Sequence, residues 1–206
     1  MITATQIIEL ILTIAIMVVL SYASIEDIRY HRITKRNVFL VLLLVLVFTM
    51  FYTTYGIERT TTFLIAFGVF GGITILTRGG FGFGDTIIIA SIALYIGRVQ
   101  EFGTYAQILG ITTLIWGAYQ IIRQRLRSKE KKFDFRFNMI DVIPIDRVVP
   151  GMILATDYFM EGLKPGDITD LKRKGYTELR IKYAYPYIPV IYFSFIIYFI
   201  FYQHII

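Results

Sequence analysis

Six long stretches of this sequence contain no Asp, Glu, Lys or Arg, and they limit the fold more than any other feature. They are residues 10–25, 37–57, 60–77, 86–97, 102–122 and 183–206. A helix that crosses a bilayer needs roughly 17–25 mostly apolar residues. Four stretches meet that length, and the first does so once residues 3–8 are added, with Glu9 near the far interface. Since only 86–97 is short, the pattern predicts six transmembrane helices, of which the fourth is unusual.

The composition is that of a membrane protein rather than of a soluble domain. The chain is 56% hydrophobic and 17% charged, whereas charged residues make up about a quarter of an ordinary soluble domain. It contains no cysteine, which excludes disulfides, thiolate metal sites and cysteine nucleophiles. We therefore expect an all-α polytopic membrane protein.

The basic residues indicate how the helices are oriented, because Lys and Arg gather in cytoplasmic loops. Nineteen of the 21 lie on one side of the predicted spans, and fourteen of these fall in residues 123–182. Only Arg59 and Arg98 fall on the other side. The first side is therefore predicted to be the cytoplasm, with both termini outside. The net charge of +6 then reflects topology and contact with the lipid bilayer, and no nucleic-acid partner is predicted.

The segment between the fifth and sixth spans differs in composition from the rest of the chain. All five prolines fall between Pro144 and Pro189. The segment is polar, charged and too long for a loop without structure of its own. We expect residues 1–125 to form five membrane helices, 126–182 a small cytoplasmic α+β domain inserted between helices five and six, and 183–206 the sixth transmembrane helix.

Within this small domain, the sequence KPGDITDLKRKGYTELRIKY predicts one short helix and one strand. Asp167 is a candidate cap for the start of the helix, and Gly175 suits its end. Leu179, Ile181 and Tyr183 then alternate with polar residues, as in a half-buried strand.

Two carboxylates near the ends of predicted spans are the candidate catalytic residues. Asp27 ends the first span and Asp85 begins the fourth, so the topology puts both near the cytoplasmic interface. Ionisable groups inside a membrane are commonly functional. Two carboxylates a few ångströms apart do not both ionise readily, so one keeps its proton. Such a pair can hydrolyse a peptide, because the ionised member takes a proton from water and the protonated member hydrogen-bonds the carbonyl.

Glycines precede Asp85 in the stretch TRGGFGFGDTIIIA, residues 77–90. Glycine permits unusual backbone angles and lets a substrate strand approach closely. Non-helical backbone at membrane depth occurs where it is buried in protein or lines a wet cavity. We therefore expect an interrupted span in which Gly82, Phe83 and Gly84 lie at the substrate backbone and present Asp85.

Gly82-Phe83-Gly84-Asp85 is a GxGD motif, and at these residues the chain resembles the GxGD aspartic peptidases of membranes. The particular resemblance is to the archaeal preflagellin and type IV prepilin peptidases. Their first catalytic aspartate closes the first helix in a D-x-R context, which Asp27-Ile28-Arg29 matches, and their second is the aspartate of GxGD. Six spans and a late soluble insertion extend the likeness over nearly the whole layout of the chain.

The resemblance implies an endopeptidase that removes the short basic leader of an archaellin or pilin-like precursor at the cytoplasmic face. Water would be the nucleophile, and neither a cofactor nor a metal is implied. The sequence departs from many relatives where Thr86 and Ile87, instead of glycine and lysine, follow GxGD. It also lacks the cysteine-rich segment of many bacterial members, so N-methylation is not implied.

Two other functions are compatible with these residues. The chain could be a proton- or cation-coupled transporter in which Asp27 and Asp85 bind the ion, although both acids lie at one interface and no internal repeat is visible. It could also be a non-catalytic anchor whose domain at 126–182 binds a partner in pilus or archaellum assembly. The sequence does not predict an oligomeric state.

Asp27 also has two simpler interpretations. It could form an ion pair with Arg29, Arg32 or Lys35, the basic residues that follow it. It could instead hold a metal together with His31, which lies one helical turn away, although no third ligand is obvious.

Glu26 and the glycines of the third span have structural explanations as well. Glu26 points about 100° away from Asp27 on a helix, so we expect a solvated acid there. Gly68, Gly71 and Gly72 suit close packing between helices. A phosphate-binding loop at residues 79–86 is disfavoured, because GGFGFGDT lacks the Lys-Ser/Thr ending of such loops.

Overall fold

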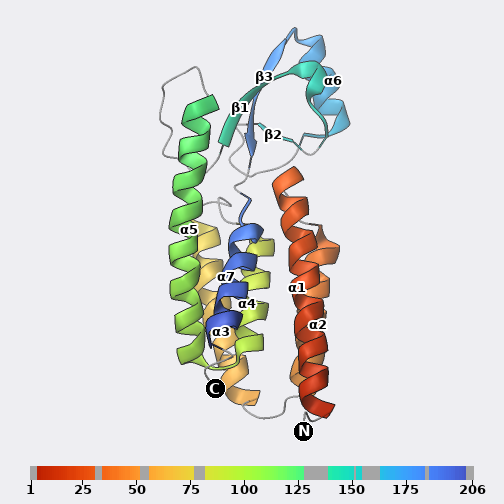
Figure 1. Ribbon diagram of the computed structural model, residues 1–206. Coiled ribbons are helices and arrows are strands. Elements are labelled where there is room, and N and C mark those ends of the chain that lie inside the picture. The colour runs from red at the N-terminus through yellow and green to blue at the C-terminus, as the bar shows by residue number, and fades with distance from the viewer. Residues whose placement is uncertain are drawn as a thin grey trace. The chain divides into compact units, whose positions relative to one another are not determined.

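The computed structural model of the protein describes residues 4–30, 34–51, 56–76, 82–127, 139–150, 152–154, 163–183 and 186–202. These residues are mostly helical, with one small sheet, as the predicted fold class requires (Figure 1). They divide into two compact units. The first contains Met1–Gly72, Phe83–Phe133 and Pro186–Ile206, and the second contains Ile73–Gly82 and Asp134–Tyr185. The six-span topology stays a prediction.

The first unit is a bundle of long helices. Its helices are α1 (Ala4–Tyr30), α2 (Lys35–Phe51), α3 (Gly56–Leu76, as far as Gly72), α4 (Phe83–Ile96), α5 (Val99–Arg127) and α7 (Ile188–Tyr202). Helix α1 packs against α2 and α7, α2 packs against α4, and α5 packs against α7. Helix α1 begins and α7 ends at the same end of this unit (Figure 1).

Helix α4 is the most enclosed helix of the bundle, and this accounts for its short apolar sequence. It has 14 residues, of which ten are buried. A helix that is apolar on every side is found in a protein core or across a membrane. At 1.5 Å per residue, α4 is about 21 Å long, shorter than the roughly 30 Å hydrocarbon core of a bilayer. In the first turn of α4, Asp85 and Thr86 are buried whereas Phe83 is exposed.

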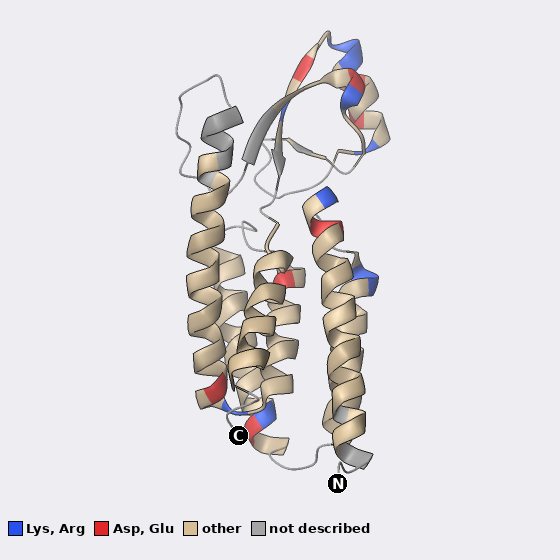
Figure 2. Ribbon diagram, viewed as in Figure 1, with Lys and Arg blue, Asp and Glu red and all other residues tan. Residues whose placement is uncertain are grey.

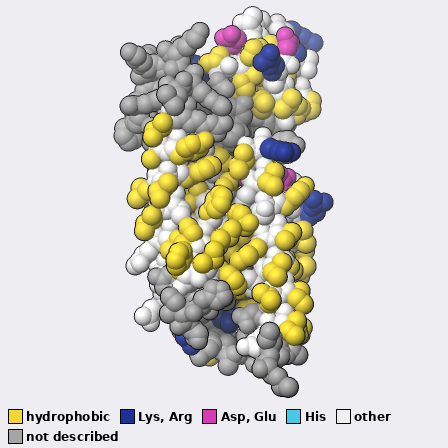
Figure 3. All heavy atoms as spheres, viewed as in Figure 1, with side chains coloured by type: hydrophobic (Ala, Val, Ile, Leu, Met, Phe, Trp, Pro, Cys, Tyr) yellow, Lys and Arg dark blue, Asp and Glu magenta, His cyan; other side chains and the backbone are white. Residues whose placement is uncertain are grey.

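The surface of the first unit is suited to lipid. Charged residues of its helices lie near helix ends, with uncharged residues between (Figure 2). On the face shown in Figure 3, hydrophobic side chains cover the helices between those ends. Among the described residues, Gln6–Arg29 and Gly56–Leu76 are long and apolar enough to cross a membrane, and Phe83–Ile96 and Ile188–Phe201 are shorter apolar helices.

A buried arginine, Arg59, caps the end of α4 opposite Asp85. The Nη1 group of Arg59 donates hydrogen bonds to the carbonyls of Leu94, at 3.1 Å, and Tyr95, at 2.9 Å. The last carbonyls of a helix have no N–H partner within the helix, so Arg59 caps α4. Gly97 follows with φ +87°, and the hydroxyl of Thr62 donates to its carbonyl at 3.2 Å. A Cβ atom at Gly97 would lie 3.0 Å from Arg59, so this turn requires glycine.

The prediction that glycines of the third span allow close helix packing is wrong for two of the three. Within the part of the chain that the structure describes, a Cβ atom added at Gly68 or Gly72 would meet no atom within 4 Å. At Gly71 it would meet Thr86 Cγ2 at 4.0 Å, an ordinary contact. Between α3 and α4, the Thr86 hydroxyl donates to the backbone carbonyl of Phe70 at 3.4 Å.

The second unit contains a three-stranded antiparallel sheet and one helix. The strands are β1 (Met139–Pro144), β2 (Ile153–Leu154) and β3 (Glu178–Tyr183), in the order β1-β3-β2. A 3₁₀ turn, η1 (Ile145–Arg147), follows β1, and α6 (Pro165–Arg173) precedes β3. In the register, Met139 faces Tyr183 and Leu154 faces Ile181. The buried core is formed by Ile145, Val148, Leu163, Ile168, Leu179 and Ile181.

The helix and strand predicted in this unit are confirmed, with one difference at the helix start. Asp167 caps α6 from the third helical position, because its carboxylate accepts the backbone N–H of Lys164 at 2.8 Å. Gly175 ends the helix with φ +82°, a backbone angle that favours glycine. On β3, Leu179 and Ile181 are buried as the alternation predicts.

Candidate active site

Asp27 lies near the end of α1, and its carboxylate is buried against the start of α7. Only 4% of the residue is exposed, and the backbone N–H of Ile188 donates to its Oδ2 at 3.0 Å. The two residues are 161 positions apart in the chain. Among the described residues Asp27 forms no ion pair with Arg29 or Lys35, while Arg32 lies outside them.

Asp85 lies in the first turn of α4 and is 8% exposed. Phe83 and Gly84 belong to the same helix, so the predicted interrupted backbone does not extend to Asp85. Gly82 directly precedes the helix, and residues 77–81 of the glycine-rich stretch lie outside the described part of the chain. The exposed ring of Phe83 meets the ring of Phe67 edge-on, with centroids 6.0 Å apart.

Helix packing puts Asp85 and Ile188 toward the same end of α4 and α7. The ring of Tyr95 on α4 packs against that of Phe195 on α7, with centroids 5.5 Å apart. Asp85 lies ten residues before Tyr95, and Ile188 lies seven before Phe195. At 1.5 Å per residue these intervals are about 15 Å and 10 Å. Because α4 and α7 run in the same direction (Figure 1), Asp85 in the first turn of α4 lies toward the end of the bundle where Ile188 bonds Asp27.

Tyr187 lies at this junction and interacts with both sides of it. Its backbone N–H is a second donor acting on the Asp27 carboxylate. Its phenol is within electrostatic range of the Asp85 carboxylate and shares a hydrogen bond of 2.7 Å with the Thr113 hydroxyl of α5. Tyr187 therefore contacts the Asp27 carboxylate through its backbone and is within electrostatic range of Asp85 through its phenol.

Glu26 is partly exposed, and its carboxylate also accepts hydrogen bonds from the protein. Its Oε2 accepts the backbone N–H of Thr34 at 3.3 Å, the Thr34 hydroxyl at 3.2 Å and the Asn37 side-chain amide at 2.6 Å. Thr34 immediately precedes α2, so Glu26 fixes the connection between α1 and α2 and leaves the neighbouring Asp27 to face α7.

A model of the type IV leader peptidase family matches residues 14–121, just over half of the chain. The chain belongs to this family. Type IV leader peptidases act on prepilin-type precursors, so the chain is a peptidase, and its apolar helices place it in a membrane. No curated protein and no solved structure gives a significant match to it.

The match to the type IV leader peptidase family includes one side of the candidate site and omits the other. Asp27, Asp85 and Thr113 fall inside residues 14–121. Tyr187 and Ile188 do not, and sequence reasoning missed them as well. The available signal was the pair of prolines around them, in Pro186-Tyr187-Ile188-Pro189.

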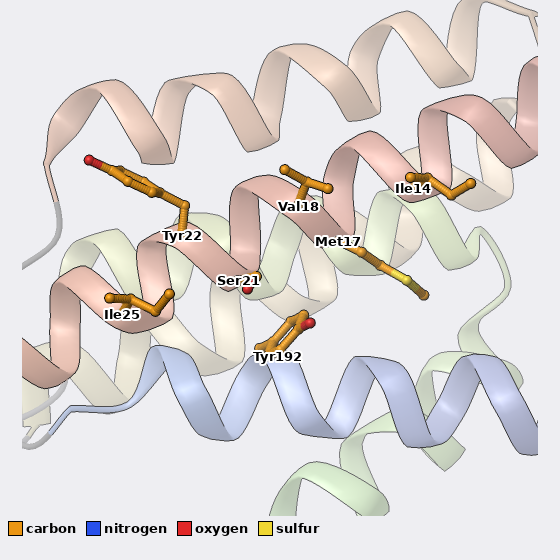
Figure 4. A pocket seen from close by; sticks show the side chains of 7 residues that line it. All are labelled: Ile14, Met17, Val18, Ser21, Tyr22, Ile25 and Tyr192. Carbon is orange, nitrogen blue, oxygen red and sulfur yellow. The ribbon is translucent and has the colours of Figure 1, made fainter.

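This type IV leader peptidase also has a groove of about 400 Å³ between α1 and α7, which Figure 4 shows. The groove is lined by Ile14, Met17, Val18, Ser21, Tyr22, Ile25 and Tyr192. No acidic or basic side chain lines it, so its chemistry suits hydrocarbon rather than catalysis. His31, the candidate metal ligand beside Asp27, lies outside the described residues.

Proposed function

We propose that the chain is a membrane aspartic endopeptidase of the GxGD type. It removes short basic leaders from archaellin or type IV pilin-like precursors at the cytoplasmic face, using Asp27 and Asp85. The observation that supports this proposal is that the buried Asp27 carboxylate bonds the start of α7, where the Tyr187 phenol is within electrostatic range of the buried Asp85. An acid in that position can exchange protons with water and with a peptide bond, the chemistry that peptide hydrolysis requires.

The proposed reaction needs only the two acids and water. The ionised aspartate takes a proton from water as the water oxygen bonds to the carbonyl carbon. At the same time the protonated aspartate hydrogen-bonds the carbonyl oxygen. The carbon–nitrogen bond then breaks, and the amide nitrogen leaves with a proton from the acid pair. The products are a leader with a new carboxylate and a precursor with a new amino terminus.

The proposed topology has six spans, α1 to α5 and α7, with both termini outside and the 126–182 domain in the cytoplasm. It is supported by the basic residues, nineteen of 21 on one side. It is also supported by α1 beginning and α7 ending at the same end of the bundle (Figure 1). In this orientation Asp27 and Asp85 lie at the cytoplasmic end, where a basic leader meets the hydrophobic helix of a precursor. Gly82, Phe83 and Gly84 are proposed to lie along the substrate backbone.

The function is tested by incubating membranes that contain the protein with a precursor made of a short basic leader and an apolar helix. Mass spectrometry of the products should locate a single cut between leader and helix. An excess of chelator should leave the rate unchanged, since no step uses a metal. Cleavage that stops with chelator, or ion-dependent uptake without cleavage, would contradict the proposal.

Replacing Tyr187 by phenylalanine should lower kcat without abolishing cleavage. The change removes the phenol that bonds Thr113 and neighbours Asp85, but it keeps the backbone N–H beside Asp27. One hydrogen bond contributes about 0.5–1.5 kcal/mol, so the loss should not exceed about tenfold. Thr113→Ser keeps the hydroxyl and is the matched control, with kcat near that of wild type. An unchanged kcat in Tyr187→Phe would show that the phenol does not contribute to catalysis.

A further inference from the structure

The sequence Pro186-Tyr187-Ile188-Pro189 places two N–H groups between two residues that have none. Proline lacks a backbone N–H, so Tyr187 and Ile188 carry the only amide donors of this run. Helix α7 begins at Ile188, and the first N–H groups of a helix have no partner within it. The two donors are therefore available to an acceptor from elsewhere in the chain.

Both donors act on the Asp27 carboxylate. The Ile188 N–H donates to Oδ2 at 3.0 Å in a buried contact, and the Tyr187 N–H is the second backbone donor to the same group. This acceptor comes from α1, so the contact joins the first and last helices of the bundle.

The carbonyls of the same segment are held by other partners, which fixes the direction of the N–H groups. The carbonyl of Pro186 accepts the indole N–H of Trp116 at 3.1 Å. The carbonyl of Tyr187 accepts the N–H groups of Val190 at 3.0 Å and Ile191 at 3.2 Å. With each carbonyl turned into α5 or α7, the segment cannot rotate to release Asp27 without breaking these bonds.

We propose that the N–H groups of Tyr187 and Ile188 form a clamp that orients the Asp27 carboxylate for catalysis, which makes the start of α7 a positioning element of the active site. The inference rests on the proposed function of Asp27. An amide N–H bonds only to an acceptor lone pair, so proton exchange with water takes place at the lone pairs that the clamp leaves open. The clamp thus determines which side of the carboxylate faces the substrate.

The test removes a single donor while the helix is kept. Ile188→Pro deletes the N–H that reaches Oδ2, at the first helical position, where proline is well tolerated. Ile188→Val keeps the N–H and loses a comparable amount of side chain, so it is the matched control. A misplacement of about 1 Å can cost on the order of a hundredfold in rate. We therefore expect kcat of Ile188→Pro to fall about tenfold to a hundredfold with KM unchanged, and Ile188→Val to retain the kcat of wild type.

Two further measurements keep the inference testable if proline disturbs folding. Replacing Ile188 by its α-hydroxy acid exchanges the amide N–H for an ester oxygen and leaves the side chain in place, and it should reproduce the loss in kcat. A proline or ester variant with the kcat of Ile188→Val would overturn the clamp. In that case Asp27→Asn separates the two proposals. If Asp27→Asn also cleaves normally, the proposed function is contradicted as well; if Asp27→Asn is inactive, only the clamp is contradicted.

Discussion

Replacing Asp27 or Asp85 by asparagine is expected to reduce cleavage about a hundredfold to ten-thousandfold, the range attributed to a general acid or base. Asparagine has the volume of aspartate and keeps an oxygen that can accept the Ile188 N–H, but it can neither take nor give a proton at neutral pH. Because asparagine matches the volume of aspartate and carries no charge that burial would penalise, the two variants should fold normally. Single-turnover cleavage of the precursor measures the loss in each.

Glu26→Gln is the matched control for these variants. Glu26 is adjacent to Asp27, but its carboxylate is engaged with Thr34 and Asn37 at the start of α2. A Glu26→Gln enzyme should therefore cleave at the wild-type rate.

The double variant of Asp27 and Asp85 should be no slower than either single variant, because the effects of groups that act as one unit are not additive. Normal cleavage by either single variant would remove that residue from the mechanism.

The largest loss of stability is expected from Arg59→Met. Methionine keeps much of the apolar stem but removes the two hydrogen bonds that cap α4 and the contact between the guanidinium and the Phe48 ring, 5.6 Å from its centroid. Hydrogen bonds to charged groups contribute about 1.5–3 kcal/mol each, and unpaired buried carbonyls add a cost, so unfolding should become easier by about 2–4 kcal/mol. Denaturant unfolding of the protein in detergent micelles measures this change.

Arg98→Met is the control for charge removal at the same end of the bundle. Arg98 is exposed and forms a 3.1 Å ion pair with Glu101 three residues later. Exposed ion pairs contribute about 0–1 kcal/mol, so Arg98→Met should have little effect. The folded fraction of Arg59→Met should retain normal kcat, because Asp85 lies about 15 Å along α4 from the carbonyls that Arg59 caps. Equal stability of the two arginine variants would show that Arg59 does not cap α4.

The helices of the bundle could be predicted because their signal is local. The absence of charge over each stretch depends only on consecutive residues, and the short stretch 86–97 corresponds to the enclosed helix α4. The candidate acids were also visible, since ionisable residues are rare within apolar stretches. Their proposed convergence depends on the arrangement of the helices, in which the end of α1 meets the start of α7.

The contacts that complete the site could not be predicted because they are made by backbone atoms distant in sequence. The N–H of Ile188 reaches Asp27 across 161 residues, and every residue except proline has such a group. The role of Arg59 could not be predicted for the same reason. In the sequence it lies between two predicted spans, and its partners are backbone carbonyls of α4. The prediction of an interrupted backbone directly before Asp85 is wrong for Phe83 and Gly84, which belong to α4. There, helix packing outweighs the low helix propensity of the glycine.

The convergence of the two acids is tested most directly by cross-linking, since the natural chain contains no cysteine. A protein carrying Asp27→Cys and Asp85→Cys should be joined internally by a short bifunctional thiol reagent, and the bound reagent should be found on both α1 and α4 peptides. A protein carrying Asp27→Cys and Glu101→Cys, which puts the second thiol at the opposite end of the bundle, should not. Failure of the first pair to cross-link while both thiols react singly would contradict a shared active site at Asp27 and Asp85.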